Sequence, residues 1–127
     1  MVQPYLIVLP TEKRGSGVFA TDDIPAGTTI EISPAIVMES TDRGHLDQTK
    51  LHDYIFEWNP VANQCCVGLG YISIYNHACP SNCAYEMDFE NDLMEIKTTR
   101  DIKKGEELFI NYNGSFDDEK PVWFEVQ

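Results

Sequence analysis

The sequence predicts a mostly β protein made of several small antiparallel sheets with short helices. β-Branched runs lie on either side of a Ser-Pro pair in residues 28–38. Residues 84–99 alternate between apolar and polar side chains around a polar turn. Residues 23–27 and 101–105 are two Asp-Ile turns of the same shape, each ending in glycine. A chain of 127 residues is expected to form one domain, spanning residues 1–127.

The N-terminal third predicts the first strands. An apolar run at 5–9 reads as an edge or first strand, and a basic, glycine-bearing turn at 13–17 precedes a strand at 18–20. Residues 28–32 and 35–38 predict two strands separated by Ser33-Pro34. Taken alone, the Gly-x-Gly of the basic turn is more often a simple turn than a ligand site.

Residues 39–63 have the least pattern and are predicted to be a variable insert. Leu51, Tyr54, Ile55 and Trp58 fit a helical period, whereas Tyr54, Phe56 and Trp58 fit the alternation of a strand equally well. Periodicity therefore leaves a helix and a strand open in this region. Such an aromatic cluster is usually core.

The central block, residues 70–83, combines a short helix with a turn. Tyr71, Ile74 and Tyr75 recur at helical spacing, and the pattern then breaks at Asn76-His77. The short helix would deliver two polar side chains into the turn. As isolated residues, Asn76 and His77 would more often be structural turn formers.

The second half of the chain predicts a hairpin and a last strand. Residues 84–89 alternate, 90–92 turn and 93–99 return. The turn at 101–105 then leads into a period-2 run that places Leu108, Ile110 and Tyr112 on one face. Tyr112 would end this strand.

The charge of the chain excludes one class of partner. With 21 acidic and 9 basic residues the net charge is −12, which argues against direct contact with a nucleic-acid backbone. It suits a basic protein partner, although acidity can also serve only to keep a small protein soluble. No apolar run approaches the roughly 20 residues that span a bilayer, and the N-terminus lacks a secretory pattern. We therefore expect a soluble intracellular protein, cytoplasmic or otherwise, that does not contact a membrane.

The cysteines and histidines do not predict a metal site. Cys65, Cys66, Cys79 and Cys83 form no C-x-x-C pair, and the three histidines are scattered. In an intracellular protein, reduced and partly buried thiols are expected.

Three segments resemble the motifs of one family. Residues 76–82 read Asn-His-Ala-Cys-Pro-Ser-Asn, residues 105–112 read Gly-Glu-Glu-Leu-Phe-Ile-Asn-Tyr, and residues 14–20 read Arg-Gly-Ser-Gly-Val-Phe-Ala. The first two occur in the right order along the chain, with the third upstream, and together they resemble the motifs of the SET domain, the fold of most protein-lysine methyltransferases. The first motif departs from the family in having Ala78 for Ser and its proline one place early. The second has Asn111 where Asp is usual.

The resemblance covers roughly residues 4–113, and in plan it is greatest to the small stand-alone SET proteins of viruses and bacteria. It implies a β-clip fold in which the Tyr112 segment threads beside the Asn76 loop. It also favours a strand at 53–57. The chain has no cysteine after Cys83, so the zinc-binding tail of many relatives is not expected. Residues 113–127 would instead form a closing segment without metal.

The resemblance further implies an S-adenosylmethionine-dependent protein-lysine N-methyltransferase. The hydroxyl of Tyr112, the predicted catalytic residue, would accept weak C–H···O contacts from the methyl group. The glycine loop would hold the methionine end of the cofactor, and the Asn-His pair would hold its adenosine and carboxylate parts. Two aromatic residues near the C-terminus would cover either the cofactor or the core. The predicted cofactor-binding residues are Ser16, Gly17, Val18, Asn76, His77, Tyr112, Trp123 and Phe124.

The predicted substrate-binding residues are Tyr75, Tyr85 and Ile110. Tyr85 lies where some SET enzymes have a tyrosine that bonds the lysine amine, although it could equally be a cross-strand packing residue. Ile110 lies where other members limit the number of methyl groups, and that number stays open here. The substrate would be a lysine flanked by basic residues, such as one in a histone tail or a ribosomal protein.

Two other interpretations compete with an enzyme. SET domains share the β-clip core with small ligand-binding domains, so the chain could be a catalytically silent binding module. Alternatively, aromatic residues such as Tyr71 and Trp123 could form the contact of a structural homodimer. Retention of Tyr112, Asn76 and His77 together argues against the silent module.

Overall fold

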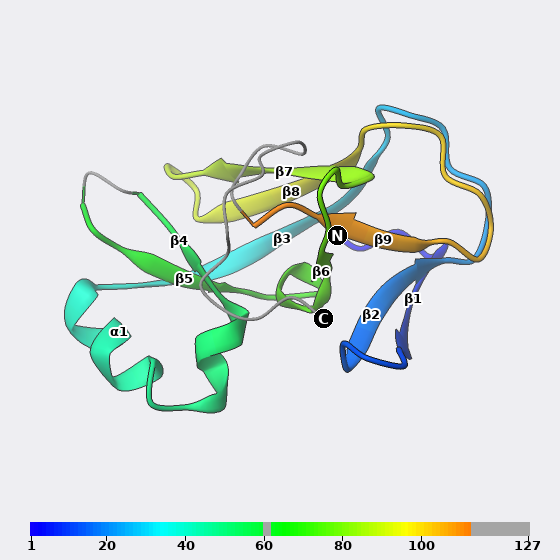
Figure 1. The fold of residues 1–127 in the computed structure, drawn as a ribbon. Helices are drawn as coiled ribbons and strands as arrows, with labels where there is room; N and C mark the ends of the chain where they lie inside the picture. Colours follow the sequence, from blue (N-terminus) through cyan, green and yellow to red (C-terminus); the bar gives the residue numbers. More distant parts are fainter. Residues whose placement is uncertain (60–61, 113–127) are drawn as a thin grey trace.

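The computed structural model describes residues 1–59 and 62–112, and it is mostly β, as predicted (Figure 1). Two curled sheets have the strand orders β1-β2-β9-β6 and β4-β5-β3-β8-β7. The elements in chain order are β1 (Leu6–Pro10), β2 (Ser16–Ala20), β3 (Thr29–Met38), α1 (Ser40–Leu46), the 3-10 helix η1 (Lys50–Tyr54), β4 (Ile55–Glu57), β5 (Cys65–Gly68), the 3-10 helix η2 (Ile72–Ile74), β6 (Asn76–His77), β7 (Cys83–Asp88), β8 (Leu93–Thr98) and β9 (Glu107–Ile110).

The first sheet joins three segments that are far apart in the sequence. β1 and β2 form an antiparallel hairpin, and β2 continues antiparallel to β9 through the pair Val18 and Leu108. On its other edge β9 runs parallel to the short β6, with Asn76 opposite Phe109 and His77 opposite Ile110. Figure 1 shows β6 passing beside β9. This parallel pair positions the candidate site.

The second sheet corrects one prediction. Residues 28–32 and 35–38 were expected as two strands, but β3 runs unbroken from Thr29 to Met38 through Pro34. Proline cannot donate a ladder hydrogen bond. β3 tolerates Pro34 because that residue is the last one paired with β8, and pairing with β5 begins at Ala35. The strand therefore changes partner at the proline instead of ending there.

Most other predicted elements are found within a residue or two of their expected positions. Asn76-His77, predicted as a turn, is instead the short strand β6, because it pairs with the distant β9. Helix α1 was not predicted. The hairpin at 84–99 is β7 and β8, and the short helix before Asn76 is η2. The ambiguous stretch at 51–58 is divided between both alternatives, because η1 leads directly into β4. Tyr112 lies two residues beyond the end of β9.

The two Asp-Ile turns bind each other reciprocally. Ile24 and Ile102 exchange backbone hydrogen bonds of 2.9 and 2.8 Å. The Asp23 carboxylate accepts the Lys104 amide at 2.8 Å, and the Asp101 carboxylate accepts the Ala26 amide at 2.8 Å. The turn before β9 is thereby anchored to the turn before β3.

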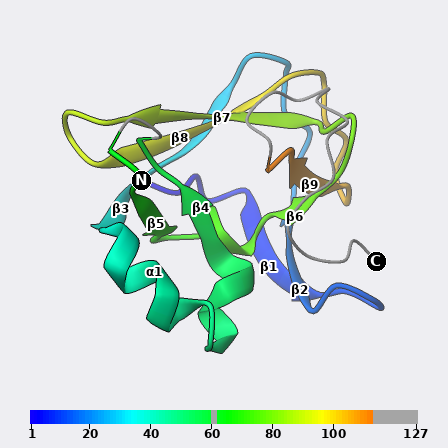
Figure 2. The same ribbon diagram turned by 60° about the vertical axis from the view of Figure 1, so that its left-hand side comes forward.

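The core is formed by side chains from both sheets and from η2. Figure 2 shows the backbone of the two sheets from a second direction. The largest fully buried members of the core are Tyr75, Ile24, Ile30, Ile55, Ile72, Met94, Ile96, Ile102, Leu108, Ile110, Glu31 and Val18. Across residues 1–59 and 62–112, no helix has the length and apolarity needed to cross a bilayer. Within the same ranges, no group of three His, Cys, Asp or Glu side chains is placed to hold a metal ion.

Candidate active site

The parallel pairing of β6 with β9 brings Tyr112 close to Asn76 and His77. The Tyr112 amide donates to His77 Nδ1 at 3.1 Å, and the two ring centroids are 5.2 Å apart. The Tyr112 hydroxyl donates to the main-chain carbonyl of Tyr75. Both ends of Tyr112 are therefore held by the segment that contains the Asn-His pair.

An aromatic wall fixes the ring of Tyr112. Phe56 packs edge-on against it with centroids 5.8 Å apart, and Tyr85 in turn packs against Phe56 with centroids 5.6 Å apart. The Tyr85 hydroxyl donates to the Tyr112 carbonyl at 3.0 Å. Burial raises the pKa of Tyr112 above its usual range, so its phenol is protonated at neutral pH.

His77 can make its contact with Tyr112 only as a neutral imidazole, because Nδ1 must accept the amide proton. Burial, assisted by the nearby Arg14 charge, lowers the pKa of His77 and favours that neutral form. Arg14 Nη1 donates to the His77 carbonyl at 3.1 Å, and its guanidinium lies 5.2 Å from the ring centroid of Phe109.

Gly17 allows the glycine loop to approach this corner closely. A Cβ at residue 17 would lie 2.5 Å from Glu107 Oε2 and 3.0 Å from Asn76 Nδ2. The Asn76 amide donates to the Ser16 carbonyl at 3.1 Å and to Glu107 Oε2 at 2.8 Å. The loop, Asn76 and Glu107 thus form one polar cradle that any side chain larger than hydrogen would fill.

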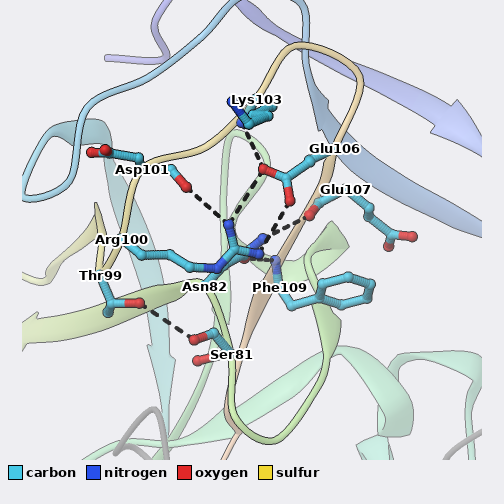
Figure 3. Close-up of polar contacts among 9 residues, drawn as sticks. All are labelled: Ser81, Asn82, Thr99, Arg100, Asp101, Lys103, Glu106, Glu107 and Phe109. Carbon is cyan, nitrogen blue, oxygen red and sulfur yellow. Dashed lines mark hydrogen bonds and ion pairs between the residues drawn. The ribbon is translucent and has the colours of Figure 1, made fainter.

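An open groove of about 520 Å³ lies beside this cradle. Figure 3 shows several of its polar residues, drawn from the Asn82 loop, the Arg100 turn and β9. Arg100 Nη2 binds Glu106 Oε1 at 3.2 Å, and Glu106 Oε2 also accepts the Lys103 amide at 2.6 Å. The groove is lined by Ala78, Pro80, Ser81, Asn82, Thr99, Arg100, Glu106, Glu107 and Phe109.

Asn82 gives the groove a rigid floor. Its Nδ2 donates to the Glu107 carbonyl at 2.9 Å, and its Oδ1 accepts the Phe109 amide at 2.7 Å (Figure 3). Asn82 is 5% exposed. Its amide group bonds two backbone groups of β9 that a neighbouring strand would otherwise pair with.

A second, much smaller pocket lies between Tyr112 and residues 53–56. Its walls come from η1, β4 and η2, and Tyr112 closes it. It is lined by Asp53, Tyr54, Ile55, Phe56, Ser73 and Tyr112. The pocket leaves about 0 Å³ of space for a water molecule, so its walls are in close contact in this structure. Its aromatic rings and one carboxylate are groups that can contact an aliphatic amine.

The structure brings together most of the predicted site residues. The main chain at Ser16 and Gly17, the Asn76 amide, the His77 ring and Tyr112 all meet at one corner. The side chain of Val18 is fully buried in the core, so only its backbone could face a ligand. Trp123 and Phe124 lie outside the described residues.

The three predicted substrate-binding residues are less accessible to a ligand than the residues at that corner. The Tyr75 and Ile110 side chains have no exposed surface and belong to the core. Tyr85 faces the site, but its hydroxyl is engaged by the Tyr112 main chain. For all three, a role in substrate binding stays a prediction.

Sequence reasoning missed three residues of this corner. Phe56 was assigned to core, although it packs directly on Tyr112. Arg14 and Glu107 lie within the recognised motifs but were given no role, although both contact the Asn-His segment. Their presence in those motifs was the available indication.

Comparison with known proteins agrees with this geometry. The model of the SET domain matches residues 15–113. The chain belongs to the SET domain family. A fission yeast (Schizosaccharomyces pombe) SET relative named histone-lysine N-methyltransferase, H3 lysine-37 specific, is 34% identical over 126 residues, which cover 98% of this chain and 80% of that protein.

Longer relatives contain the same SET region. A Cryptococcus neoformans protein named histone-lysine N-methyltransferase, H3 lysine-36 specific, is 34% identical over 114 residues. The match covers 84% of this chain but 14% of the relative.

Solved structures share the SET fold. A candidate histone methyltransferase of Plasmodium falciparum superposes with a TM-score of 0.69 at 26% identity, covering 91% of this chain and 98% of that one. The Ezh2-containing PRC2 assembly gives a TM-score of 0.76 at 20% identity, covering 93% of this chain and 16% of that one. At that identity, the second similarity concerns the fold alone.

Proposed function

We propose that this SET domain is an S-adenosylmethionine-dependent methyltransferase that acts on the side-chain amine of a lysine in a basic protein. The observation that carries the proposal is the junction of Tyr112 with residues 75–77, where the amide of Tyr112 is held by His77 and its hydroxyl by the Tyr75 carbonyl. The names of the SET relatives, all histone-lysine N-methyltransferases, support the same reaction class.

The residues of the polar cradle fit the proposed cofactor. S-adenosylmethionine carries an ammonium, a carboxylate and an adenine ring. The cradle offers the Glu107 carboxylate, the Asn76 amide and main-chain groups at Ser16 and Gly17, where the absent Cβ allows Glu107 to approach the loop. Phe109, which lines the adjoining groove, offers an aromatic surface. When bound, the cofactor would supply an electrophilic methyl group on a sulfonium.

The residues of the chain would supply alignment and a suitable environment. A free lysine has a pKa of about 10.4 and is charged at neutral pH, so it cannot act as a nucleophile. Desolvation by Phe56, Tyr54 and Tyr112 would lower the pKa of the amine and favour its neutral form, whereas Asp53 in the same pocket acts in the opposite direction. The Tyr112 oxygen, held toward the Tyr75 carbonyl, would orient the methyl through C–H···O contacts.

The acidic surface supports a basic substrate. Asp53 lines the small pocket, and Asp47 and Glu57 lie on the neighbouring insert within a chain of net charge −12. The excess of carboxylates in the chain would attract a lysine that has basic neighbours. A histone H3 tail is the first substrate to test, because the SET relatives are named for it.

Calorimetry and methyl transfer test the proposal together. The protein should bind S-adenosylmethionine and transfer labelled methyl to histone H3 or to a basic protein in a lysate. Tyr112→Phe should lower the rate roughly a hundredfold with little change in cofactor affinity. Tyr5→Phe, which removes a hydroxyl near the start of β1, is the matched control and should retain activity.

The outcomes separate the alternatives. Cofactor binding without transfer to any basic protein would indicate a catalytically silent module. Absence of cofactor binding would refute the proposal. Asn76→Ala should weaken cofactor binding, since it removes the amide that joins the glycine loop to Glu107.

A further inference from the structure

Glu31 is a charged residue type in the interior of the protein. It lies in β3 and its relative exposure is 0%, although carboxyl groups are rarely buried without partners. Removing a carboxyl group from water is costly unless hydrogen bonds replace its hydration. An apolar side chain at this position would avoid that cost. The presence of a carboxyl group here therefore needs a physical reason.

Hydrogen bonds to both oxygens compensate the burial. Oε2 accepts the Ser33 hydroxyl at 2.7 Å and the Tyr71 amide at 2.8 Å, and Oε1 accepts the Tyr75 hydroxyl at 2.8 Å. Burial beside Glu31 raises the pKa of Tyr75 well above its usual range, which keeps that phenol protonated and able to donate.

These bonds fix both ends of η2. Tyr71 precedes the helix and Tyr75 follows it, and each donates to a different oxygen of the same carboxyl group. Gly70 allows the close fit, because a Cβ there would lie 2.4 Å from Glu31 Oε2 and its backbone has a φ of +58°. The helix that leads into β6 is therefore clamped to β3.

The clamp continues to the candidate catalytic residue. The hydroxyl of Tyr75 binds Glu31, and the main-chain carbonyl of the same Tyr75 accepts the Tyr112 hydroxyl. Two successive hydrogen bonds thus connect a residue of the second sheet to the phenol beyond β9. Glu31 does not line either pocket, so it would act only through Tyr75.

We propose that Glu31 is a positioning residue, which orients the Tyr112 hydroxyl through Tyr75 and so sets the rate of methyl transfer. The inference rests on the proposed function for the role of Tyr112. A small displacement of an aligning group can lower a rate about a hundredfold without changing ligand affinity. Loss of the Glu31–Tyr75 hydrogen bond would allow Tyr75 to shift and would displace the Tyr112 hydroxyl in this way.

Tyr75→Phe and Glu31→Gln test this arrangement. Tyr75→Phe removes only the hydroxyl, and Glu31→Gln keeps the shape of the side chain but replaces one acceptor by a donor. We expect kcat to fall about tenfold or more in each, with KM and the Kd for S-adenosylmethionine within about threefold. Ser33→Ala is the control, because it removes a hydrogen bond to the same carboxyl group on the oxygen that does not bind Tyr75.

A Tyr112→Phe background separates positioning from general destabilisation. If Glu31 acts through the Tyr112 hydroxyl, adding Tyr75→Phe to Tyr112→Phe should cause no further loss of kcat. A loss of the same factor in both backgrounds, or an equal loss in Ser33→Ala, would overturn the inference. Tyr75→Phe keeps the test decisive if Glu31→Gln does not fold.

A spectroscopic measurement keeps the inference independent of activity. The ¹³Cζ resonance of Tyr112, assigned with Tyr112→Phe, reports the hydrogen bond of its hydroxyl. It should shift in Tyr75→Phe and remain in place in Ser33→Ala. If the wild-type protein transferred no methyl group, the proposed function would fail, whereas a shifted resonance would still establish that the Glu31–Tyr75 bond orients the Tyr112 hydroxyl. An unshifted resonance would refute it.

Discussion

At the scale of single residues, the imidazole of His77 joins the two halves of the junction. Its Nδ1 accepts a hydrogen bond from the Tyr112 amide. Protonation of that nitrogen would break the bond, because two N–H donors would then face each other. Burial is the main cause that lowers the pKa of His77, and the Arg14 charge adds to it. The integrity of the junction is therefore linked to pH.

This linkage predicts the pH dependence of stability. An unfolded histidine has a pKa of about 6.5, so as pH falls below that value the unfolded chain takes up a proton before folded His77 does. The free energy of unfolding should therefore decrease from about pH 6.5 down through the lowered folded pKa. Urea denaturation at several pH values would measure how steeply the free energy of unfolding changes with pH. This slope should be smaller in His77→Asn. His45→Asn, on exposed α1, is the control, and equal slopes in wild type and His77→Asn would contradict the assignment.

The cysteines predict a second residue-scale result. Burial raises the pKa of Cys66 and of Cys83 to about 12 and also raises that of Cys65, so these thiols stay protonated and shielded. Cys79 is the exposed member of the set. A thiol reagent should label one of the four cysteines rapidly in the native protein and all of them in denaturant. Rapid labelling of a second native thiol would show that the core opens easily.

At the scale of elements, β9 depends on a single side chain along part of its length. Asn82 bonds the Glu107 carbonyl and the Phe109 amide, and it takes the place of a neighbouring strand. The parallel contact with β6 begins at Phe109 and is short. The position of Tyr112 is thus set by a loop side chain as well as by sheet pairing.

Asn82→Ala should destabilise the protein for this reason. Leaving two part-buried backbone groups without partners costs about 1–3 kcal/mol each, so we expect a loss of roughly 2–4 kcal/mol in the free energy of unfolding. Asn91→Ala in the exposed β7–β8 turn, where the side chain bonds Asp88, should cost less than about 1 kcal/mol. Similar losses in both variants, measured by chemical denaturation, would show that Asn82 does not support β9.

At the scale of the whole molecule, charge is the dominant feature. A net charge of −12 on 127 residues produces a long-range field that attracts cations and repels polyanions. Salt screens this field, with a Debye length of about 10 Å at 0.1 M ionic strength. Recognition of a basic protein should therefore include a component that ordinary salt removes.

The salt dependence of KM tests that component. For a lysine peptide with basic neighbours, KM should rise several-fold between about 50 mM and about 500 mM NaCl, with a smaller change in kcat. A peptide with the same target lysine and neutral neighbours is the control and should respond weakly. A KM for the basic peptide that is independent of salt would mean that the acidity serves solubility alone.

Much of the fold could be predicted, because strands and turns follow from neighbouring residues. The β7–β8 hairpin follows from alternation over 84–99. The two Asp-Ile turns follow from their matching sequences, Asp-Ile-Pro-Ala-Gly at 23–27 and Asp-Ile-Lys-Lys-Gly at 101–105. The division of β3 at Pro34 was wrong, because proline's missing donor is harmless where a strand changes partner. That change of partner depends on β5 and β8, which lie outside the local pattern.

By itself, the sequence determined the mostly β class, the turns, and the motifs around Asn76 and Tyr112 that place the chain in the SET family. Only the tertiary structure decided which donors meet which acceptors: the Tyr112 amide with His77 Nδ1, and the Tyr75 hydroxyl with buried Glu31. The physical reason is distance along the chain. Periodicity records contacts between near neighbours, whereas the partners in these bonds are 35 and 44 residues apart and meet only when the two sheets pack.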